Sequence, residues 1–277
     1  MPLVFRPQLL WVRVLALSLT CITFNVNYHS GYPFPPEMNY WCIFCWAFSF
    51  TCTLLVLLVE FFGLQSHVLV SWANFPITVA CYAALLCLSA SVIFPFYYLK
   101  NSNLDSNFRD YRIATTVFSC LATVMYMGEV CLSKARPGEV TGYMATTPGV
   151  LKVCQTFIAC VIFSFVTSPV SYDYHLELNW CKAVYGICFI LSMAVVMICV
   201  GDCSGDLPIS FSKFLSIYGL LTVLMYLSVT VLWPVYADKY RSYKRFNMIT
   251  VSVLTAVNFL LYVADLVYSA RLVFVSS

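Results

Sequence analysis

Apolar residues run along this chain in eight long, nearly continuous stretches separated by short polar segments. A helix needs about 20 mainly apolar residues to cross a bilayer, and each stretch is close to that length. Strands are excluded because the runs do not alternate and because an open sheet edge cannot face lipid. We therefore predict an all-α integral membrane protein with eight transmembrane helices, at about Leu9–Val26, Trp41–Gly63, Phe75–Tyr98, Arg112–Cys131, Val150–Val166, Trp180–Val200, Phe211–Trp233 and Asn247–Val267.

The same pattern occurs twice, at an offset of 139 residues. Lys152 repeats Arg13, and the pair Trp180-Cys181 repeats Trp41-Cys42; further on, Tyr262 repeats Tyr126 at an offset of 136. Internal repeats of this kind set the architecture. We predict two tandem four-helix modules, residues 1–133 and 149–277, joined by a cytoplasmic linker at 134–148. Four spans per copy give both copies the same orientation, unlike the inverted repeats of many transporters.

Composition limits the function to the membrane. Apolar residues make up 61% and charged residues 10% of the chain, against about 45–50% and about 25% in soluble domains. The net charge of +3 and the lack of basic runs argue against a nucleic-acid partner. The loops are too short for a soluble domain, and we find no catalytic motif, phosphate loop or metal-ligand cluster. We therefore expect no enzyme, cofactor or metal.

Lysine and arginine place the N-terminus on the cytoplasmic side. Arg6 and Arg13 flank the first span, and the loop at 27–40 has no basic residue, which is the positive-inside pattern. The basic loop Asp238–Arg245 stands against this orientation. Because the first helix usually dominates, we expect both termini to be cytoplasmic.

Five ionisable residues lie inside predicted spans, where an unpaired charge is costly. They sit toward one leaflet, and each module has a base on its first helix and an acid on its fourth. We predict structural intramembrane ion pairs among Arg13, Glu60, Glu129, Lys152 and Asp265. A proton or cation path is the alternative, although acids at one depth do not form a relay.

The fourteen cysteines lack metal-type spacing. Cys42 and Cys181, at the outer ends of matching spans, are candidates for a disulfide. Three others lie at predicted cytoplasmic ends, where palmitoylation occurs: Cys131, Cys199 and Cys203.

Three long strings carry a resemblance to a known family. They are ARPGEVTGYMATTPGVLKV at 135–153, NFPITVACYAALLCLSASVIFP at 74–95 and YVADLVYSARLVFV at 262–275. The chain resembles the myeloid-associated differentiation marker family, which consists of tandem MARVEL four-helix modules. It departs from that family in the short loop Asp238–Asn247.

The resemblance implies a non-enzymatic protein of the plasma membrane. It implies a role in organising cholesterol-rich, condensed membrane domains (membrane rafts), in membrane trafficking and apposition, and in cell spreading. The implied partners are membrane lipids, cholesterol among them, other membrane or cytoskeleton-linked proteins, and a second copy of the chain. A channel or transporter, or its accessory subunit, remains the alternative function.

Overall fold

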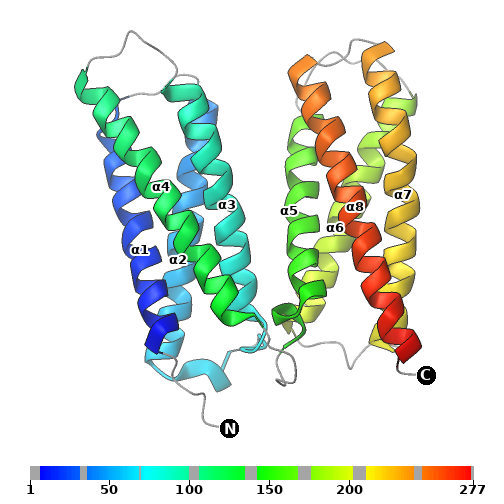
Figure 1. The fold of residues 1–277 in the computed structure, drawn as a ribbon, viewed down its shortest axis with the longest axis horizontal. Coiled ribbons are helices and arrows are strands. Elements are labelled where there is room, and N and C mark those ends of the chain that lie inside the picture. The colour runs from blue at the N-terminus through cyan, green and yellow to red at the C-terminus, as the bar shows by residue number, and fades with distance from the viewer. Residues whose placement is uncertain are drawn as a thin grey trace. The chain divides into compact units, whose positions relative to one another are not determined.

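The computed structural model describes residues 7–31, 36–68, 70–99, 106–134, 142–167, 176–201, 210–239 and 245–275. Within these ranges the chain is all-helical, and eight helices are long and apolar enough to cross a membrane, as predicted. They are α1 (Pro7–Tyr28), α2 (Pro36–Phe61), α3 (Phe75–Tyr98), α4 (Ser106–Ser133), α5 (Thr147–Thr167), α6 (Leu176–Gly201), α7 (Phe211–Lys239) and α8 (Arg245–Val275), with short 3₁₀ turns η1 (Leu64–Ser66) and η2 (Tyr143–Ala145) (Figure 1).

Several helices extend beyond their apolar stretches. The helix α2 begins at Pro36, five residues before Trp41, because proline fits the first turn, where no backbone N–H is needed. The helix α7 continues past Pro234 to Lys239. A proline removes one helical hydrogen bond, and so close to the end of α7 this loss does not stop the helix.

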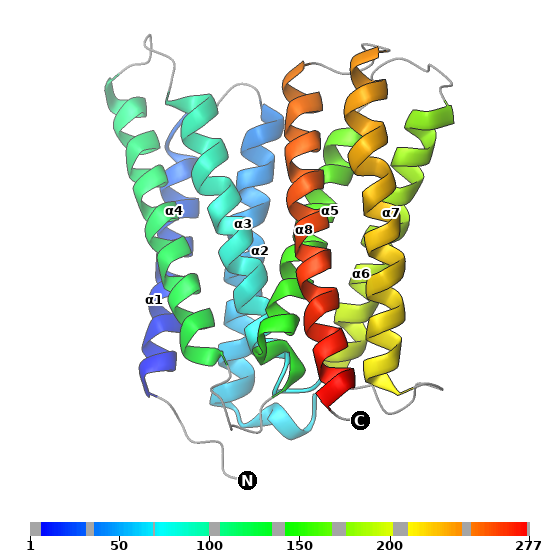
Figure 2. The ribbon, with the colours of Figure 1, turned by 45° about the vertical axis from the view of Figure 1, so that its right-hand side comes forward.

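The chain divides into two compact units, residues 1–146 and 147–277. In the first unit the helices contact one another in a closed ring, in which α1 packs on both α2 and α4, and α3 packs on the same two helices. The helices α5 to α8 form the equivalent ring in the second unit. Figure 2 shows the four helices of each unit running side by side along their length.

Each unit buries polar side chains among apolar ones, and many large apolar side chains are exposed on its outside. The buried face of α1 consists of Arg13, Ala16, Thr20, Thr23 and Asn27, spaced three or four residues apart as one helix face requires. Because lipid tails are as apolar as leucine, helices in a membrane associate through small and hydrogen-bonding residues. Large apolar side chains such as Phe44 and Leu224 are left exposed to lipid.

The end of the predicted linker packs on the first unit. The turn η2 contacts α3, and the Asn74 side-chain oxygen accepts the Met144 backbone N–H at 3.0 Å. Gly142 lies so close that a Cβ there would stand 2.1 Å from that same oxygen. Residues 135–141 of the linker lie outside the described residues.

Candidate functional site

An arginine with two carboxylates lies at one end of the first unit. The Arg13 side chain on α1 donates from Nε to Glu129 on α4 at 2.6 Å, and from Nη1 to Glu60 on α2 at 2.5 Å. The side chains of Arg13 and Glu129 are buried, whereas that of Glu60 is 21% exposed. The structure thus brings together the three residues of this unit for which the sequence predicts ion pairs. The Arg13–Glu129 pair is more deeply buried than the Arg13–Glu60 pair.

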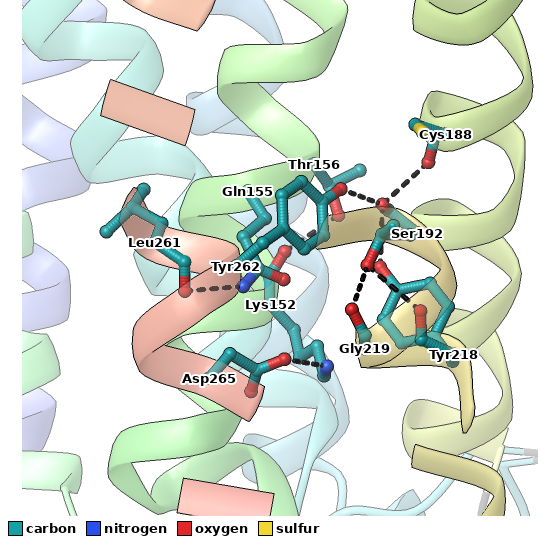
Figure 3. A network of polar contacts seen from close by, with 11 residues as sticks. Lys152, Gln155, Thr156, Cys188, Ser192, Tyr218, Gly219, Leu261, Tyr262 and Asp265 are labelled. Atoms are coloured by element: carbon teal, nitrogen blue, oxygen red, sulfur yellow. Dashed lines mark hydrogen bonds and ion pairs between the residues drawn. The ribbon is translucent and has the colours of Figure 1, made fainter. Parts of the chain in front are cut away.

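The second unit holds a simpler pair at the equivalent place. The Lys152 ammonium on α5 forms an ion pair with Asp265 on α8, and both side chains are fully buried (Figure 3). The ammonium also lies 4.4 Å from the centre of the Tyr218 ring on α7, a cation–π contact. The position of Glu60 is taken by Cys199, 139 residues later. Within the described ranges, Lys152 therefore has one carboxylate partner where Arg13 has two.

In each unit, a network of hydroxyl groups also links the helices. In the first unit, Tyr126 on α4 donates to the Ser49 carbonyl at 3.2 Å, and its oxygen lies 2.9 Å from the Thr53 hydroxyl on α2. In the second, the Ser192 hydroxyl on α6 meets Tyr262 at 2.5 Å and Tyr218 at 2.8 Å (Figure 3).

Proton counting fixes the direction of the bonds around Ser192. Its hydroxyl donates to the Cys188 carbonyl at 2.7 Å. Since a hydroxyl has one proton and two lone pairs, Tyr218 and Tyr262 must both donate to it. Three helices are thereby joined at one oxygen.

Another contact, between the second and fourth helices, occurs at equivalent positions in the two units but is made by different side chains. Trp46 on α2 donates to the Ser119 hydroxyl at 2.9 Å, and the equivalent residues Tyr185 and Thr255 place their hydroxyls 2.9 Å apart. Each pair joins the second helix of its unit to the fourth. Duplication has thus preserved the points of contact while the residues that make them have changed.

Arg112 is a structural residue that the sequence reasoning missed. It lies in the first turns of α4, and its side chain donates to the carbonyls of Ser30 at 3.3 Å and Tyr98 at 3.2 Å. Ser30 lies two residues past the end of α1 and Tyr98 is the last residue of α3, where backbone acceptors lack helical partners. A cation there also suits the helix dipoles. The signal in the sequence is a basic residue at the predicted start of a span.

The candidate cysteines differ in their exposure. Cys42 and Cys181 are free thiols, and each is buried within its own unit, so the structure provides no support for the suggested disulfide. Cys131, at the end of α4, is exposed, whereas Cys199 is buried, which argues against acylation of Cys199. Cys203 lies outside the described residues.

These side chains form a packing network that joins the helices within each unit. The charged groups are paired across helices, and the hydroxyls bond to each other or to carbonyls. Among the described residues no group of three or more His, Cys, Asp or Glu could hold a metal ion.

Comparisons with known proteins agree with this architecture. A model of the membrane-associating domain MARVEL matches residues 143–268. The chain is 49% identical to the myeloid-associated differentiation marker homolog of Xenopus laevis, over 96% of this chain and 92% of the relative. It is 46% identical to the human myeloid-associated differentiation marker, over 95% and 88%, and 38% identical to human myeloid-associated differentiation marker-like protein 2, over 96% and 92%. No solved structure gives a significant match.

Proposed function

Since this chain belongs to the myeloid-associated differentiation marker family of multi-pass MARVEL membrane proteins, we propose that it organises cholesterol-rich, condensed membrane domains. The family is one of membrane proteins and not of enzymes. In this proposal the protein acts at the plasma membrane, with both termini cytoplasmic, and supports trafficking, membrane apposition or cell spreading.

The internal pairing of charge is the observation that carries the proposal. Lys152 meets Asp265, and Arg13 meets Glu129, inside their own four-helix units. A group that is already paired inside the bundle does not bind a polar substrate without first losing its partner. The helices also expose many large apolar side chains, so membrane lipid is the partner that fits the exterior best.

The lipid-facing side of α2 offers a specific surface for ordered lipid. Trp41, Phe44 and Phe48 form a row of rings with successive centroids 5.7 and 5.8 Å apart, and Phe44 and Phe48 are exposed. Rigid rings side by side favour straight acyl chains and flat sterols, because both gain contact area without bending. At the equivalent places α6 has Ala183 and Ile187, so the row is a property of the first unit.

Reconstitution tests the proposal. The purified full-length chain is placed in giant vesicles of saturated phosphatidylcholine, unsaturated phosphatidylcholine and cholesterol, and its partition between phases and the order around it are read with an order-sensitive dye. We expect enrichment in the ordered phase and raised local order. The variant Phe44→Ala with Phe48→Ile, which copies the residues of α6, should reduce both while leaving the buried network intact.

Two results would overturn the proposal. The first is exclusion of the wild-type protein from the ordered phase with unchanged lipid order. The second is selective ion or solute flux through protein-containing liposomes, which would favour the channel or transporter alternative.

A further inference from the structure

The contact between α5 and α8 contains two fully buried carboxamides that the first unit lacks. Gln155 on α5 and Asn258 on α8 are both 0% exposed. The residues at the equivalent positions of α1 and α4 are Ala16 and Ala122, which are also buried. Polar side chains inside a membrane protein are costly and are associated with function. The substitution of two alanines by two amides in one seam therefore requires an explanation.

The hydrogen bonds of the two amides fix their orientation. The Gln155 side-chain nitrogen donates to the Leu261 carbonyl at 3.1 Å. The Asn258 nitrogen donates to the Gln155 backbone carbonyl at 3.4 Å and to the Tyr226 hydroxyl at 2.8 Å. Turning either amide over would set its oxygen against a carbonyl oxygen. Each amide nitrogen thus has a hydrogen-bond partner, whereas the two amide oxygens have none among the described residues.

Three buried oxygen atoms along this seam have no hydrogen-bond partner among the described residues. They are Gln155 Oε1, Asn258 Oδ1 and Asp265 Oδ1. A buried polar atom without a partner costs about 1–3 kcal/mol, and native proteins normally satisfy such atoms with protein or with ordered water. All three atoms are acceptors, so whatever binds them must donate hydrogen bonds or carry positive charge.

The charges of the seam favour a neutral donor. Lys152 and Asp265 form a buried pair with no net charge, and an added cation would leave one uncompensated positive charge beside Lys152. We therefore propose that the α5–α8 seam binds water, with one molecule at the Gln155 and Asn258 oxygens and another at Asp265 Oδ1. Two molecules are needed because Asn258 and Asp265 are seven residues apart on one helix, or about 10 Å at roughly 1.5 Å per residue.

The site is near enough to the membrane surface to fill from solvent. Gln155 follows the start of α5 at Thr147 by eight residues, or about 12 Å along the helix. The α1–α4 seam has alanine at both equivalent positions and therefore no side-chain acceptor at either one. The first unit should therefore be dry at the place where the second is hydrated.

Hydroxyl-radical footprinting with short X-ray pulses tests this inference on the full chain in lipid nanodiscs. Radicals formed from bound water oxidise side chains beside it, even when bulk solvent cannot reach them. Tyr226, which receives the Asn258 hydrogen bond, is the reporter, and Tyr126 of the first unit is the control; both are 0% exposed. We expect Tyr226 to be oxidised at least several-fold faster than Tyr126.

The variant Gln155→Ala with Asn258→Ala gives the seam the residues of the first unit. It should lower the oxidation rate of Tyr226 to that of Tyr126. Equal rates for the two tyrosines in the wild-type protein would overturn the inference, and this comparison needs no variant to fold. Replacing sodium and potassium by choline should change neither the rates nor the melting temperature; a change in either would indicate a bound cation and overturn the assignment to water.

Discussion

Replacing Asp265 by asparagine should destabilise the protein far more than replacing Glu60 by glutamine. Both changes remove one carboxylate and keep the shape of the side chain. Among the described residues, Asp265 is the only acid that forms an ion pair with Lys152, and both side chains are 0% exposed. Arg13 still has Glu129 after Glu60 is neutralised, and the Glu60 side chain is 21% exposed.

The expected magnitudes follow from these surroundings. Removing one partner of a buried ion pair costs about 3–5 kcal/mol, because the other charge is left buried without compensation. The Tyr218 ring beside Lys152 favours the lower part of that range. A partly exposed pair contributes about 0–1 kcal/mol. At roughly 2–4 °C per kcal/mol, Asp265→Asn should lower the melting temperature by about 6–20 °C, and Glu60→Gln by about 4 °C or less.

Thermal unfolding of the full chain in nanodiscs measures both shifts, with the surviving monodisperse fraction followed by size-exclusion chromatography. The matched control is Lys152→Met with Asp265→Leu, which removes both charges at once. A buried pair replaced by apolar residues of similar size is often neutral or stabilising, so the double variant should recover most of the loss. Equal shifts for Asp265→Asn and Glu60→Gln would refute the reasoning, as would a double variant no more stable than Asp265→Asn.

Three further predictions concern other parts of the chain. Arg112→Met introduces the residue found at the equivalent position 248 and should remove the hydrogen bonds to the Ser30 and Tyr98 carbonyls. We expect the free energy of unfolding to fall by about 1.5–3 kcal/mol. Amide hydrogen exchange should become faster at the ends of α1 and α3 and stay unchanged in α5–α8. Gly142→Ala should detach η2 from α3, because the new Cβ would overlap Asn74, and limited proteolysis should then cleave near Gly142 faster than in the wild-type protein. Thiopalmitate labelling in cells should fall in Cys131→Ser and stay unchanged in Cys199→Ser, because only the first thiol is exposed; the reverse pattern would show that burial does not govern acylation here.

The sequence predicted the helices well because each span must satisfy its backbone hydrogen bonds internally and must be apolar over a fixed length. It also predicted that Arg13 and Glu129 belong to one set of ion-paired residues, since an unpaired charge inside the membrane is costly. The sequence did not predict that Glu129 would be buried and Glu60 partly exposed, because the exposure of each carboxylate depends on how the helices pack around it. The burial of Cys199 was missed for the same reason, since a position at a span end does not reveal which way a side chain faces.

Gln155 and Asn258 illustrate a different limit. Their alignment with two alanines was available from the repeat, but amides in a membrane helix are read equally well as packing groups. Only the contacts between helices show that both side-chain nitrogens donate hydrogen bonds while both side-chain oxygens lack a partner among the described residues.

The long separation between paired charges has a consequence for how the chain is made. Arg13 precedes Glu129 by 116 residues, and Lys152 precedes Asp265 by 113. At about 5–20 residues per second, each base waits roughly 6–23 s in the nascent chain before its acid on the fourth helix is synthesised. During that time Arg13 gains its other partner, Glu60, 47 residues later, whereas Lys152 has Cys199 at the equivalent place. The second unit should therefore depend more than the first on the cell's insertion machinery to shield its unpaired helix.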